Sequence, residues 1–288
     1  MAQFTWLDPF TRTSAQEVAD AAATVRARAM AAGYLVVRGL LPAADVRAVR
    51  TAILGPLMAA GWCDAEGCVE PQTPRRTEGE PDFMVVYDQV QRLEAFHRLS
   101  LHPALLGLYR ALFAEDVLPH ARNIARMMFP ANNFHTTPPH QDHPLIGGTP
   151  ETWTAWIPLG DCPLSLGGLA VMAGSHREGL LPVTPAPGAG GVAVDAAGLD
   201  YRWVGGDLEA GDVLTFHSRT VHTGLPNLTP DRMRLSADFR YQPRSQPIRA
   251  DSLDPHFARL SWAEIYAGWS STEGQYYWRE MAPTLSER

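Results

Sequence analysis

The sequence predicts a mainly β protein with flanking helices, whose core is a β-sandwich or a jelly-roll barrel. From about residue 123, short runs rich in β-branched and aromatic residues recur, and each is bounded by Pro, Gly, Asn or Asp. Many short strands of this kind are typical of sandwiches and jelly rolls, whereas parallel folds alternate strands with helices. The strands are predicted at residues 123–129, 152–159, 168–173, 201–204, 212–217 and 234–241.

Helical patterns dominate the first 119 residues. Ser14 and Glu17 fit a capping box, in which each side chain bonds to the other residue's backbone N–H. The Ala-rich segment behind them should form one helix that ends at Gly33, because glycine readily takes the left-handed conformation at a helix end. Two more helical segments are predicted at residues 42–60 and 94–113, the second interrupted or kinked near Pro103.

Several segments between these helices and strands should be non-helical. Residues 34–39 form a β-branched run that predicts a strand. Residues 62–82 contain Pro, Gly, Glu and Arg without periodicity, and we expect a long loop there. The segment 182–200 is rich in Pro, Gly and Ala and predicts a surface loop or insertion. A carboxy-terminal helix is expected to begin at residue 262.

Size and composition are those of one globular domain. The 288 residues include 45% apolar and 19% charged positions, which is enough apolar material to bury a large core. No linker-like segment divides the chain. We therefore expect a single domain with a helical elaboration over about residues 1–119, a β core over about 120–243 and a helical tail over about 244–288.

The charge balance and the cysteines exclude several classes of partner. Net charge is 24 − 31 = −7 without a dense Lys/Arg run, so nucleic acid is not an expected partner. No apolar run approaches the roughly 18 residues that span a bilayer, and the amino terminus lacks a signal-peptide pattern, so a cytoplasmic location without a membrane partner is expected. The odd set of Cys63, Cys68 and Cys162 predicts reduced thiols rather than disulfides or a metal site. The oligomeric state is not indicated.

His140, Asp142 and His222 form the most informative pattern in the chain. The order His-x-Asp…His supplies two imidazoles and one carboxylate, the ligand set of the facial triad that binds non-haem Fe(II) and leaves coordination positions open. Residues i and i+2 of a strand point to the same face. We therefore predict that His140 and Asp142 lie on one strand and converge on one ion, with His222 brought in by the fold.

Other histidines compete for the same role. On a strand, His143 has the wrong parity to share a face with His140. His217 ends the run at residues 212–217 and could take the place of His222. A lone histidine is more often a hydrogen-bonded structural residue than a ligand, so the assignment depends on the joint pattern.

Several motifs, in the right order, resemble the phytanoyl-CoA dioxygenase family of Fe(II)/2-oxoglutarate-dependent oxygenases. They are TPPHQDH at residues 137–143, WTAWIPL at 153–159, GGLAVMAGSH at 167–176 and GDVLTFHSRTVH at 211–222. The likeness covers about residues 120–243, with a weaker match at 33–42. It implies a double-stranded β-helix core, a jelly-roll of the cupin type, and it implies that His140, Asp142 and His222 bind iron.

The family also places an arginine about ten to twelve residues after the distal histidine, where it pairs with the distal carboxylate of 2-oxoglutarate. Arg232 and Arg234 both fit this distance and share strand parity. We favour Arg234, because it begins an alternating run whose apolar residues point to the opposite face. Trp156 matches an aromatic position that lines the 2-oxoglutarate pocket in relatives, although a core tryptophan is an equally good interpretation.

The resemblance implies a hydroxylase that uses Fe(II), 2-oxoglutarate and O₂ to oxidise an unactivated C–H bond of a small organic molecule, releasing succinate and CO₂. Asp142 argues against halogenation, because halogenating relatives carry a small residue there. A moderately apolar substrate is favoured by three aromatic residues predicted to line the pocket, namely Trp153, Phe134 and Tyr87. Further polar candidates without an assigned role are Arg122, Arg126 and Gln141.

Two alternative functions remain open at this point. The first is a cupin-type metalloenzyme that does not use 2-oxoglutarate, although such sites usually recruit more histidines. The second, less favoured, is a non-catalytic β-helix module that binds a ligand. The residues named above do not distinguish hydroxylation from desaturation, cyclisation or epimerisation, and they do not identify the native substrate.

Overall fold

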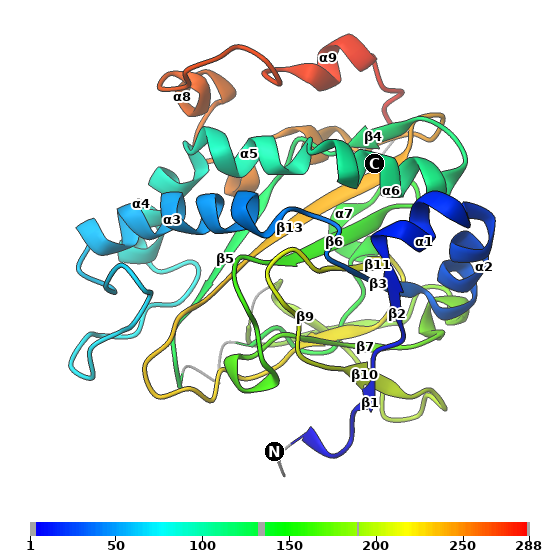
Figure 1. Cartoon of the computed structure of the whole chain (residues 1–288), viewed down its shortest axis with the longest axis horizontal. Helices are drawn as coiled ribbons and strands as arrows, with labels where there is room; N and C mark the ends of the chain where they lie inside the picture. Colours follow the sequence, from blue (N-terminus) through cyan, green and yellow to red (C-terminus); the bar gives the residue numbers. More distant parts are fainter. Residues whose placement is uncertain (1–3, 132–135, 189, 287–288) are drawn as a thin grey trace.

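The computed structural model describes residues 4–131, 136–188 and 190–286. These residues form three layers, a group of helices, a seven-stranded sheet and a four-stranded sheet (Figure 1). The helices cover one face of the larger sheet, and the smaller sheet faces its other side. Within the described residues the sheets do not close into a continuous barrel. The arrangement confirms the predicted mainly β fold with flanking helices.

The strands pair in the following order. In the larger sheet the order is β2 (Arg12–Ser14), β3 (Tyr34–Arg38), β11 (Val213–His217), β6 (Trp153–Pro158), β13 (Arg234–Pro243) and β4 (Val117–Pro119). β5 (Ile124–Met128) also pairs with β13. In the smaller sheet the order is β1, β10, β7, β12, which span Asp8–Pro9, Trp203–Gly205, Leu169–Met172 and His222–Gly224. A separate hairpin consists of β8 and β9, which span Val183–Pro185 and Val192–Val194.

The helices α1 to α9 span Ala15–Asp20, Ala22–Ala32, Ala43–Ala59, Pro81–Gln91, Glu94–Ser100, Pro103–Phe113, His143–Ile146, Trp262–Tyr266 and Tyr277–Met281. Short 3₁₀ turns occur at Leu164–Leu166, Ser175–Glu178, Ala250–Leu253 and His256–Ala258. The predicted helices at residues 42–60 and 94–113 are confirmed as α3 and as the pair α5 and α6. α4 has no counterpart among the predicted helices.

The first predicted helix is divided in two. Ser14 forms the expected capping box with Glu17, and Gly33 ends α2 in the left-handed conformation with φ of 72°. The expectation of one continuous helix between them is wrong, because the backbone breaks at Ala21 with φ of −135° and ψ of 40°. The break redirects the chain so that both α1 and α2 contact α6.

All the strands predicted from the sequence are present, and shorter ones join them. The runs predicted after residue 123 correspond to β5, β6, β7, β10, β11 and β13, and the run at 34–39 is β3. β4, β8, β9 and β12 are only three residues long, too short to show a periodicity. β1, β2 and β3 come from the helical amino-terminal part and still join the sheets. β1 pairs parallel to β10, β3 pairs antiparallel to β11, and β2 pairs parallel to β3.

Alternation along the central strands creates two separate apolar layers. On β6, Trp153 and Ala155 pack with the helices, whereas Trp156 packs between the two sheets. On β11, Val213 faces the helices and Leu214 faces the smaller sheet. This alternation is the period of two expected for a strand buried on both faces. It places the functional residues in the space between the sheets.

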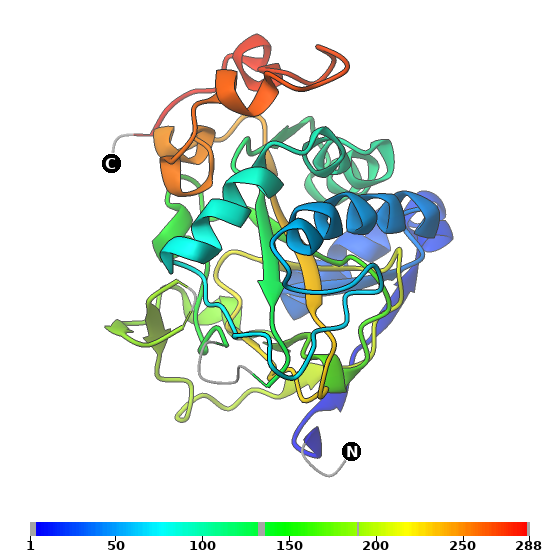
Figure 2. The same ribbon diagram turned by 90° about the vertical axis from the view of Figure 1, so that its left-hand side faces the viewer.

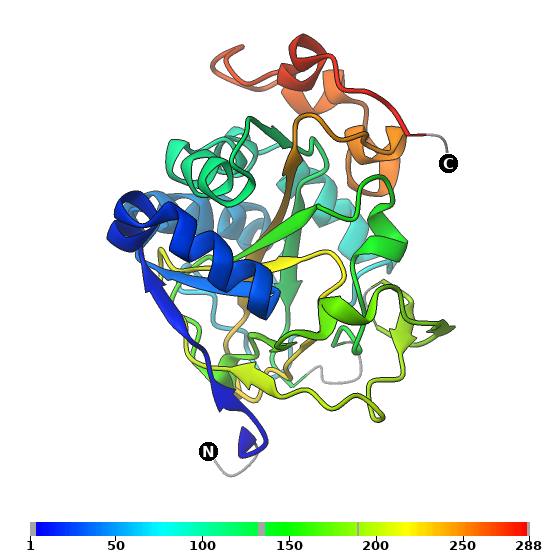
Figure 3. The same cartoon turned by 90° about the vertical axis from the view of Figure 1, so that its right-hand side faces the viewer.

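The ends of the chain and the predicted insertion lie at the periphery. The carboxy-terminal segment with α8 and α9 lies beside α5, far from the amino terminus (Figure 2), and Trp269 donates a hydrogen bond to the backbone of Arg92. The segment 182–200 contains the β8–β9 hairpin, which projects from the edge of the molecule (Figure 3).

The cysteines are free thiols, as predicted. No helix within the described residues is long and apolar enough to cross a membrane.

Candidate active site

The fold brings His140, Asp142 and His222 together in the space between the sheets. One ligand atom from each residue lies within 4.8 Å of the others, and all three residues are buried. Oδ1 of Asp142 is 3.7 Å from Nε2 of His140 and 3.9 Å from Nε2 of His222. The 80 residues that separate His222 from Asp142 in the sequence are therefore bridged by the fold, as predicted.

The local backbone at this cluster differs from the prediction. His140 and His222 form an isolated antiparallel bridge, with both N–H···O hydrogen bonds at 3.0 Å. Asp142, however, has helical dihedral angles, φ −71° and ψ −33°, and caps α7. The expectation that His140 and Asp142 share one strand is wrong, because the carbonyl group of Asp142 accepts the first hydrogen bonds of α7 and turns the chain. A turn brings the carboxylate back toward the two imidazoles.

Backbone carbonyl groups fix the tautomers of both histidines. Nδ1 of His140 lies 2.9 Å from the carbonyl oxygen of Pro138, and Nδ1 of His222 lies 3.0 Å from that of Thr220. A carbonyl oxygen only accepts, so each Nδ1 carries a proton, and in a neutral ring Nε2 is then the nitrogen with the free lone pair. Burial, with the neighbouring His140, lowers the pKa of His222 to about 3. Both requirements for metal ligation, a neutral ring and a free Nε2, are met at His222.

Asp142 is held as a carboxylate by its neighbours. Burial by itself would raise the pKa of Asp142, but the charge of Arg240 and the two histidines hold it well below its usual range. Nη2 of Arg240 lies 3.6 Å from Oδ1, and the hydroxyl group of Thr154 donates a 2.5 Å hydrogen bond to Oδ2. Oδ1 is thus the oxygen that faces the imidazoles.

The competing residues of the motif have other contacts. His217 packs its ring against Trp153, with 5.7 Å between centroids, and its Nδ1 accepts a hydrogen bond from the backbone N–H of Arg219. It does not belong to the cluster formed by the described His, Cys, Asp and Glu residues. The side-chain amide of Gln141 donates to two backbone carbonyl groups and accepts from the N–H of Leu181, so Gln141 holds loops together.

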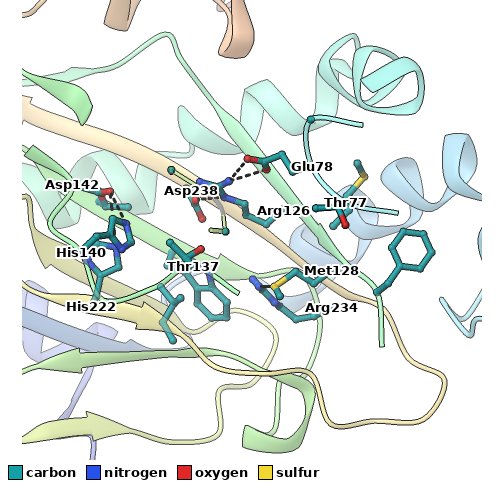
Figure 4. Close-up of a pocket in the computed structure, with 18 of the residues that line it drawn as sticks. Thr77, Glu78, Arg126, Met128, Thr137, His140, Asp142, His222, Arg234 and Asp238 are labelled. Atoms are coloured by element: carbon teal, nitrogen blue, oxygen red, sulfur yellow. Dashed lines mark hydrogen bonds and ion pairs between the residues drawn. The ribbon is translucent and has the colours of Figure 1, made fainter. Parts of the chain in front are cut away.

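A cavity of about 440 Å³ opens beside the cluster. Its polar walls include the three clustered residues and Arg234, and its apolar walls include Trp156, Phe216 and Leu169. Figure 4 shows His140, Asp142 and His222 on one side of the cavity and Arg234 with Met128 on the other. The two predicted 2-oxoglutarate contacts, Arg234 and Trp156, therefore line the same cavity as the cluster.

Arg234 is a buried cation without a counter-ion among the residues that the structure describes. Arg234 is only 3% exposed. Burial lowers the pKa of its guanidinium group, but the group remains charged because arginine does not deprotonate in proteins. Its contacts are neutral: the hydroxyl group of Ser236 at 2.7 Å, the sulfur of Met128, and the ring of Trp156 with 5.7 Å to the centroid. No ion pair with Arg234 is found among the described residues, and its Nε has no partner there. An anion in the cavity would supply the missing charge.

Arg232 has a different environment. It is exposed on the loop before β13, next to Asp231, and its backbone bridges to Cys68. Trp156 combines both of the interpretations considered for it, since it is buried in the layer between the sheets and also lines the cavity beneath Arg234. Of the two arginines, only Arg234 reaches the cavity.

The aromatic residues expected to line the pocket do not all do so. Trp153 points to the helices, because it lies an odd number of positions from Trp156 on the same strand. Tyr87 of α4 is fully buried, and its ring packs between the rings of Phe83 and His256. Both expectations are wrong. Phe134 lies outside the described residues.

The cavity also contains groups that the sequence did not single out as a set. Arg126 of β5 lies at the cavity wall, paired with Glu78 from the loop before α4 and with Asp238 of β13. Of the other polar candidates, Arg122 bonds to backbone carbonyl groups of Asp251 and Asp254 and is therefore a structural residue. The sequence does contain a pattern that points to Asp238. Polar residues alternate along β13 at Arg234, Ser236, Asp238 and Arg240, which predicts that Asp238 shares a face with Arg234.

Comparison with known families agrees with this geometry. The phytanoyl-CoA dioxygenase (PhyH) family model matches residues 30–236, which is most of the chain. The chain belongs to the phytanoyl-CoA dioxygenase family. Among curated relatives, the 1-deoxypentalenic acid 11-beta-hydroxylase of Streptomyces exfoliatus is 31% identical over 237 residues, covering 77% of this chain and 82% of the relative. That of Streptomyces arenae is 30% identical over the same shares.

Solved structures of similar fold include two enzymes from nogalamycin biosynthesis. The epimerase SnoN, in complex with Fe³⁺, α-ketoglutarate and nogalamycin RO, has a TM-score of 0.56 and 25% identity, covering 80% of this chain and 86% of SnoN. The non-haem α-ketoglutarate-dependent carbocyclase SnoK has a TM-score of 0.57 and 24% identity, covering 87% of this chain and 94% of SnoK. The double-stranded β-helix fold expected for the family is confirmed by this likeness.

Proposed function

We propose that this protein is a non-haem Fe(II)- and 2-oxoglutarate-dependent oxygenase that hydroxylates an unactivated C–H bond of a small organic molecule, with release of succinate and CO₂. The observation that carries the proposal is the pairing, in one cavity, of the His140–Asp142–His222 cluster with the unpaired cation Arg234. Membership of the phytanoyl-CoA dioxygenase family supports it. From the sequence alone, we also propose a cytoplasmic location.

The cluster fits a divalent iron ion. Two neutral imidazoles and one carboxylate are the donor set that non-haem Fe(II) oxygenases use, and both Nδ1 atoms are already committed to backbone carbonyl groups. The donor hydrogen bonds also set the orientation of the rings, which raises the affinity of such a site for metal. His140, Asp142 and His222 would therefore hold the iron.

The opposite wall fits the cosubstrate. The distal carboxylate of 2-oxoglutarate would neutralise Arg234, whose planar guanidinium can bind a carboxylate through two parallel hydrogen bonds. The unpartnered Nε of Arg234 is available for one of them. Trp156 would pack against the carbon chain, since its ring lines the cavity next to the guanidinium.

The protein itself would orient the ligands and the substrate and keep water out of the site. When bound, iron and 2-oxoglutarate supply the oxidation of a C–H bond by O₂, coupled to decarboxylation of the 2-oxo acid. Asp142 keeps its negative charge because Arg240 and Thr154 hold it as a carboxylate. Phe216 and Leu169 form apolar walls of the cavity, which would exclude water and position the substrate beside the proposed iron site. Hydroxylation is favoured because the relatives at 30% and 31% identity are named hydroxylases.

Anaerobic titration tests the proposal. Adding Fe(II) and then 2-oxoglutarate to the metal-free protein should produce a saturable visible charge-transfer band, which reports bidentate binding of the 2-oxo acid to iron. His222→Ala should lose this band. His217→Ala is the matched control, because His217 is a buried histidine on the preceding strand that lies outside the cluster, and it should keep the band.

The same titration separates the alternatives. Tight metal binding without a band on adding 2-oxoglutarate would favour a cupin-type metalloenzyme of another kind. Absence of metal binding by folded protein would favour a non-catalytic module. Either result would overturn the proposed oxygenase.

A further inference from the structure

Two guanidinium groups that line the cavity lie in opposite charge environments, the buried Arg234 and the partly buried Arg126. Arg234 has neutral contacts, as described above. Arg126, in contrast, is paired with two carboxylates: its Nη1 lies 2.8 Å and 3.0 Å from the two oxygens of Glu78, and its Nε lies 2.9 Å from Oδ2 of Asp238 (Figure 4). Arg126, Glu78 and Asp238 together carry a net charge of +1 − 2 = −1, and Arg76 and Glu80, which also line the cavity, add one charge of each sign.

This balance makes Arg126 a poor anchor for an anion. Burial would lower the pKa of Arg126, but the charges of Glu78 and Asp238 raise it, so the guanidinium is stabilised by groups that the protein already supplies. A substrate carboxylate at this wall would face two carboxylates at short range and would have to displace one of them. Arg76, the other arginine of the lining, forms an ion pair with Asp82 at 3.5 Å. The anion site of the cavity is therefore placed at Arg234, which the proposed function assigns to the cosubstrate.

Asp238 is the residue of this wall that lacks a full set of partners. It is 8% exposed, it lines the cavity, and its Oδ1 has no hydrogen-bond partner among the described residues. A buried carboxylate oxygen without a donor is costly, and native structures normally supply a partner from protein, water or ligand. Since Oδ2 already accepts from Arg126, the unmet demand is for one hydrogen-bond donor at Oδ1.

The lining near this wall is mixed: Arg76, Thr77, Glu80 and Thr137 are polar, and a group of large side chains is apolar. Phe129, Phe216 and Leu169 line the cavity, and Phe257 stands at its rim, 42% exposed. Such a surface favours a hydrocarbon skeleton, with the acidic wall as the place for its polar group. The position of Asp238 on β13, between Arg234 and the Asp142-bound Arg240, puts this group within the same cavity as the proposed iron and cosubstrate sites.

We propose that the substrate is a compact, mostly apolar molecule with a hydroxyl or protonated amino group that donates a hydrogen bond to Asp238, and that a carboxylate is disfavoured at this wall. The inference rests on the proposed function and names the substrate class of the same site. It separates this protein from its hydroxylase relative, which is named for a carboxylic acid.

Three rigid probes with one skeleton test the substrate class: 1-adamantylammonium, 1-adamantanol and 1-adamantanecarboxylate. Each is titrated by calorimetry into the anaerobic protein loaded with Fe(II) and 2-oxoglutarate, and again into the metal-free protein. The ammonium and the alcohol should bind at least about tenfold more tightly than the carboxylate, since a hydrogen bond to a charged acceptor is worth about that factor. Equal affinities, a preference for the carboxylate, or no binding by any probe would overturn the proposal.

Two variants that remove the same charge isolate the role of Asp238. In Asp238→Asn, Arg126 requires the amide oxygen at the Oδ2 position, so the amide NH₂ takes the place of Oδ1 and turns an acceptor into a donor. The preference should then invert, with the carboxylate binding more tightly than the ammonium. Glu78→Gln lowers the charge equally but keeps Oδ1, so the alcohol should bind as in the wild type and the order of the probes should stay unchanged.

The outcomes for the two proposals are distinguishable. If the order of probe affinities does not invert in Asp238→Asn, or if the two variants have identical effects, the role of Asp238 is overturned. The charge-transfer band would still support the oxygenase in that case. A missing band together with the expected order of the probes would count against the oxygenase alone. If Asp238→Asn does not fold, as judged by circular dichroism, the order of the probes in the wild type and in Glu78→Gln still decides the substrate class.

Discussion

The hydroxyl group of Thr154 donates a 2.5 Å hydrogen bond to Oδ2 of Asp142, which leaves Oδ1 as the oxygen that faces His140 and His222. Thr154 lies on β6, in the middle of the larger sheet, and its side chain points to the cavity like that of Trp156. A rigid strand therefore orients the carboxylate that we propose as an iron ligand. Oδ1 is thus the oxygen that would bind the proposed iron, because Oδ2 already accepts the hydrogen bond from Thr154.

Thr154→Val tests this arrangement. Valine keeps the shape and removes the donor, so Asp142 can rotate and the iron site loses its orientation. We expect Fe(II) affinity to fall by about 10- to 100-fold, the usual effect of losing a hydrogen bond to a metal ligand. Anaerobic Fe(II) titration measures it. Thr154→Ser keeps the hydroxyl group and should bind Fe(II) nearly as the wild type does; equal affinity of the valine variant would refute the role of Thr154.

Arg234→Lys should weaken 2-oxoglutarate binding. Lysine keeps the charge but loses the planar pair of donors, and hydrogen bonds between charged groups of this kind correspond to an increase in KM of about 10- to 100-fold. Arg232→Ala is the matched control, because Arg232 is exposed outside the cavity and should leave KM unchanged. Steady-state kinetics at varied 2-oxoglutarate measure both. A larger effect at Arg232 would reverse the assignment.

The sequence predicts those parts of the site that depend on local pattern. Alternation along β13 places Arg234 on the face opposite Leu235 and Phe239, and the structure has these residues on opposite faces. The order His-x-Asp…His predicts which residues meet, and the structure brings them together. That they bind iron remains a prediction. The turn at Asp142 is not visible in the pattern, because spacing of two suits a strand and a tight turn equally.

Contacts between distant segments explain what the sequence does not reveal. Glu78 lies in an aperiodic loop and reaches Arg126, 48 residues away, which in turn pairs with Asp238, 112 residues away. No local signal links three such residues, since the pairing depends on how the loop folds over β5. The misplacement of Trp153 has a different reason: its odd spacing from Trp156 on one strand already places it with the helices, so alternation in the sequence is enough to exclude it from the pocket.

Buried histidines away from the cluster should make the stability of the metal-free protein depend on pH. Burial lowers the pKa of His97 to about 4 and that of His120 to about 3. Between these values and the usual 6.5, the unfolded chain binds protons that the folded chain does not. The free energy of unfolding should therefore fall as pH decreases from 7 to 4, by up to about 1.4 kcal/mol per pH unit for each such histidine.

Urea unfolding at pH 7 and pH 5 with the metal chelated measures this dependence. His120→Gln removes one titrating group and keeps a donor toward the side-chain oxygen of Gln242, which lies 2.8 Å from Nε2 of His120. Its stability should change less between the two pH values than that of the wild type. An unchanged pH dependence would show that His120 titrates in the folded protein near its usual pKa.

Phe257 stores backbone strain at the rim of the cavity. It has φ of 65° and ψ of −5°, a left-handed conformation that is rare for a bulky residue, and Ala258 follows with φ of 50°. Its ring packs on His256, with 3.9 Å between centroids, and the residue is 42% exposed and lines the cavity. Strained residues often lie at ligand sites, where the surrounding structure holds them in place.

Comparing Phe257→Gly with Phe257→Ala isolates this strain. Both variants lose the ring, but only glycine relieves the left-handed backbone, so Phe257→Gly should be more stable than Phe257→Ala by about 1 kcal/mol. Ala258→Gly should gain a similar amount over the wild type, because it relieves the next residue without removing a ring. Both Phe257 variants should bind 1-adamantanol more weakly and to the same extent, since the lost contact is the same. Urea unfolding and calorimetry measure these effects, and equal stabilities of the two Phe257 variants would contradict the strain.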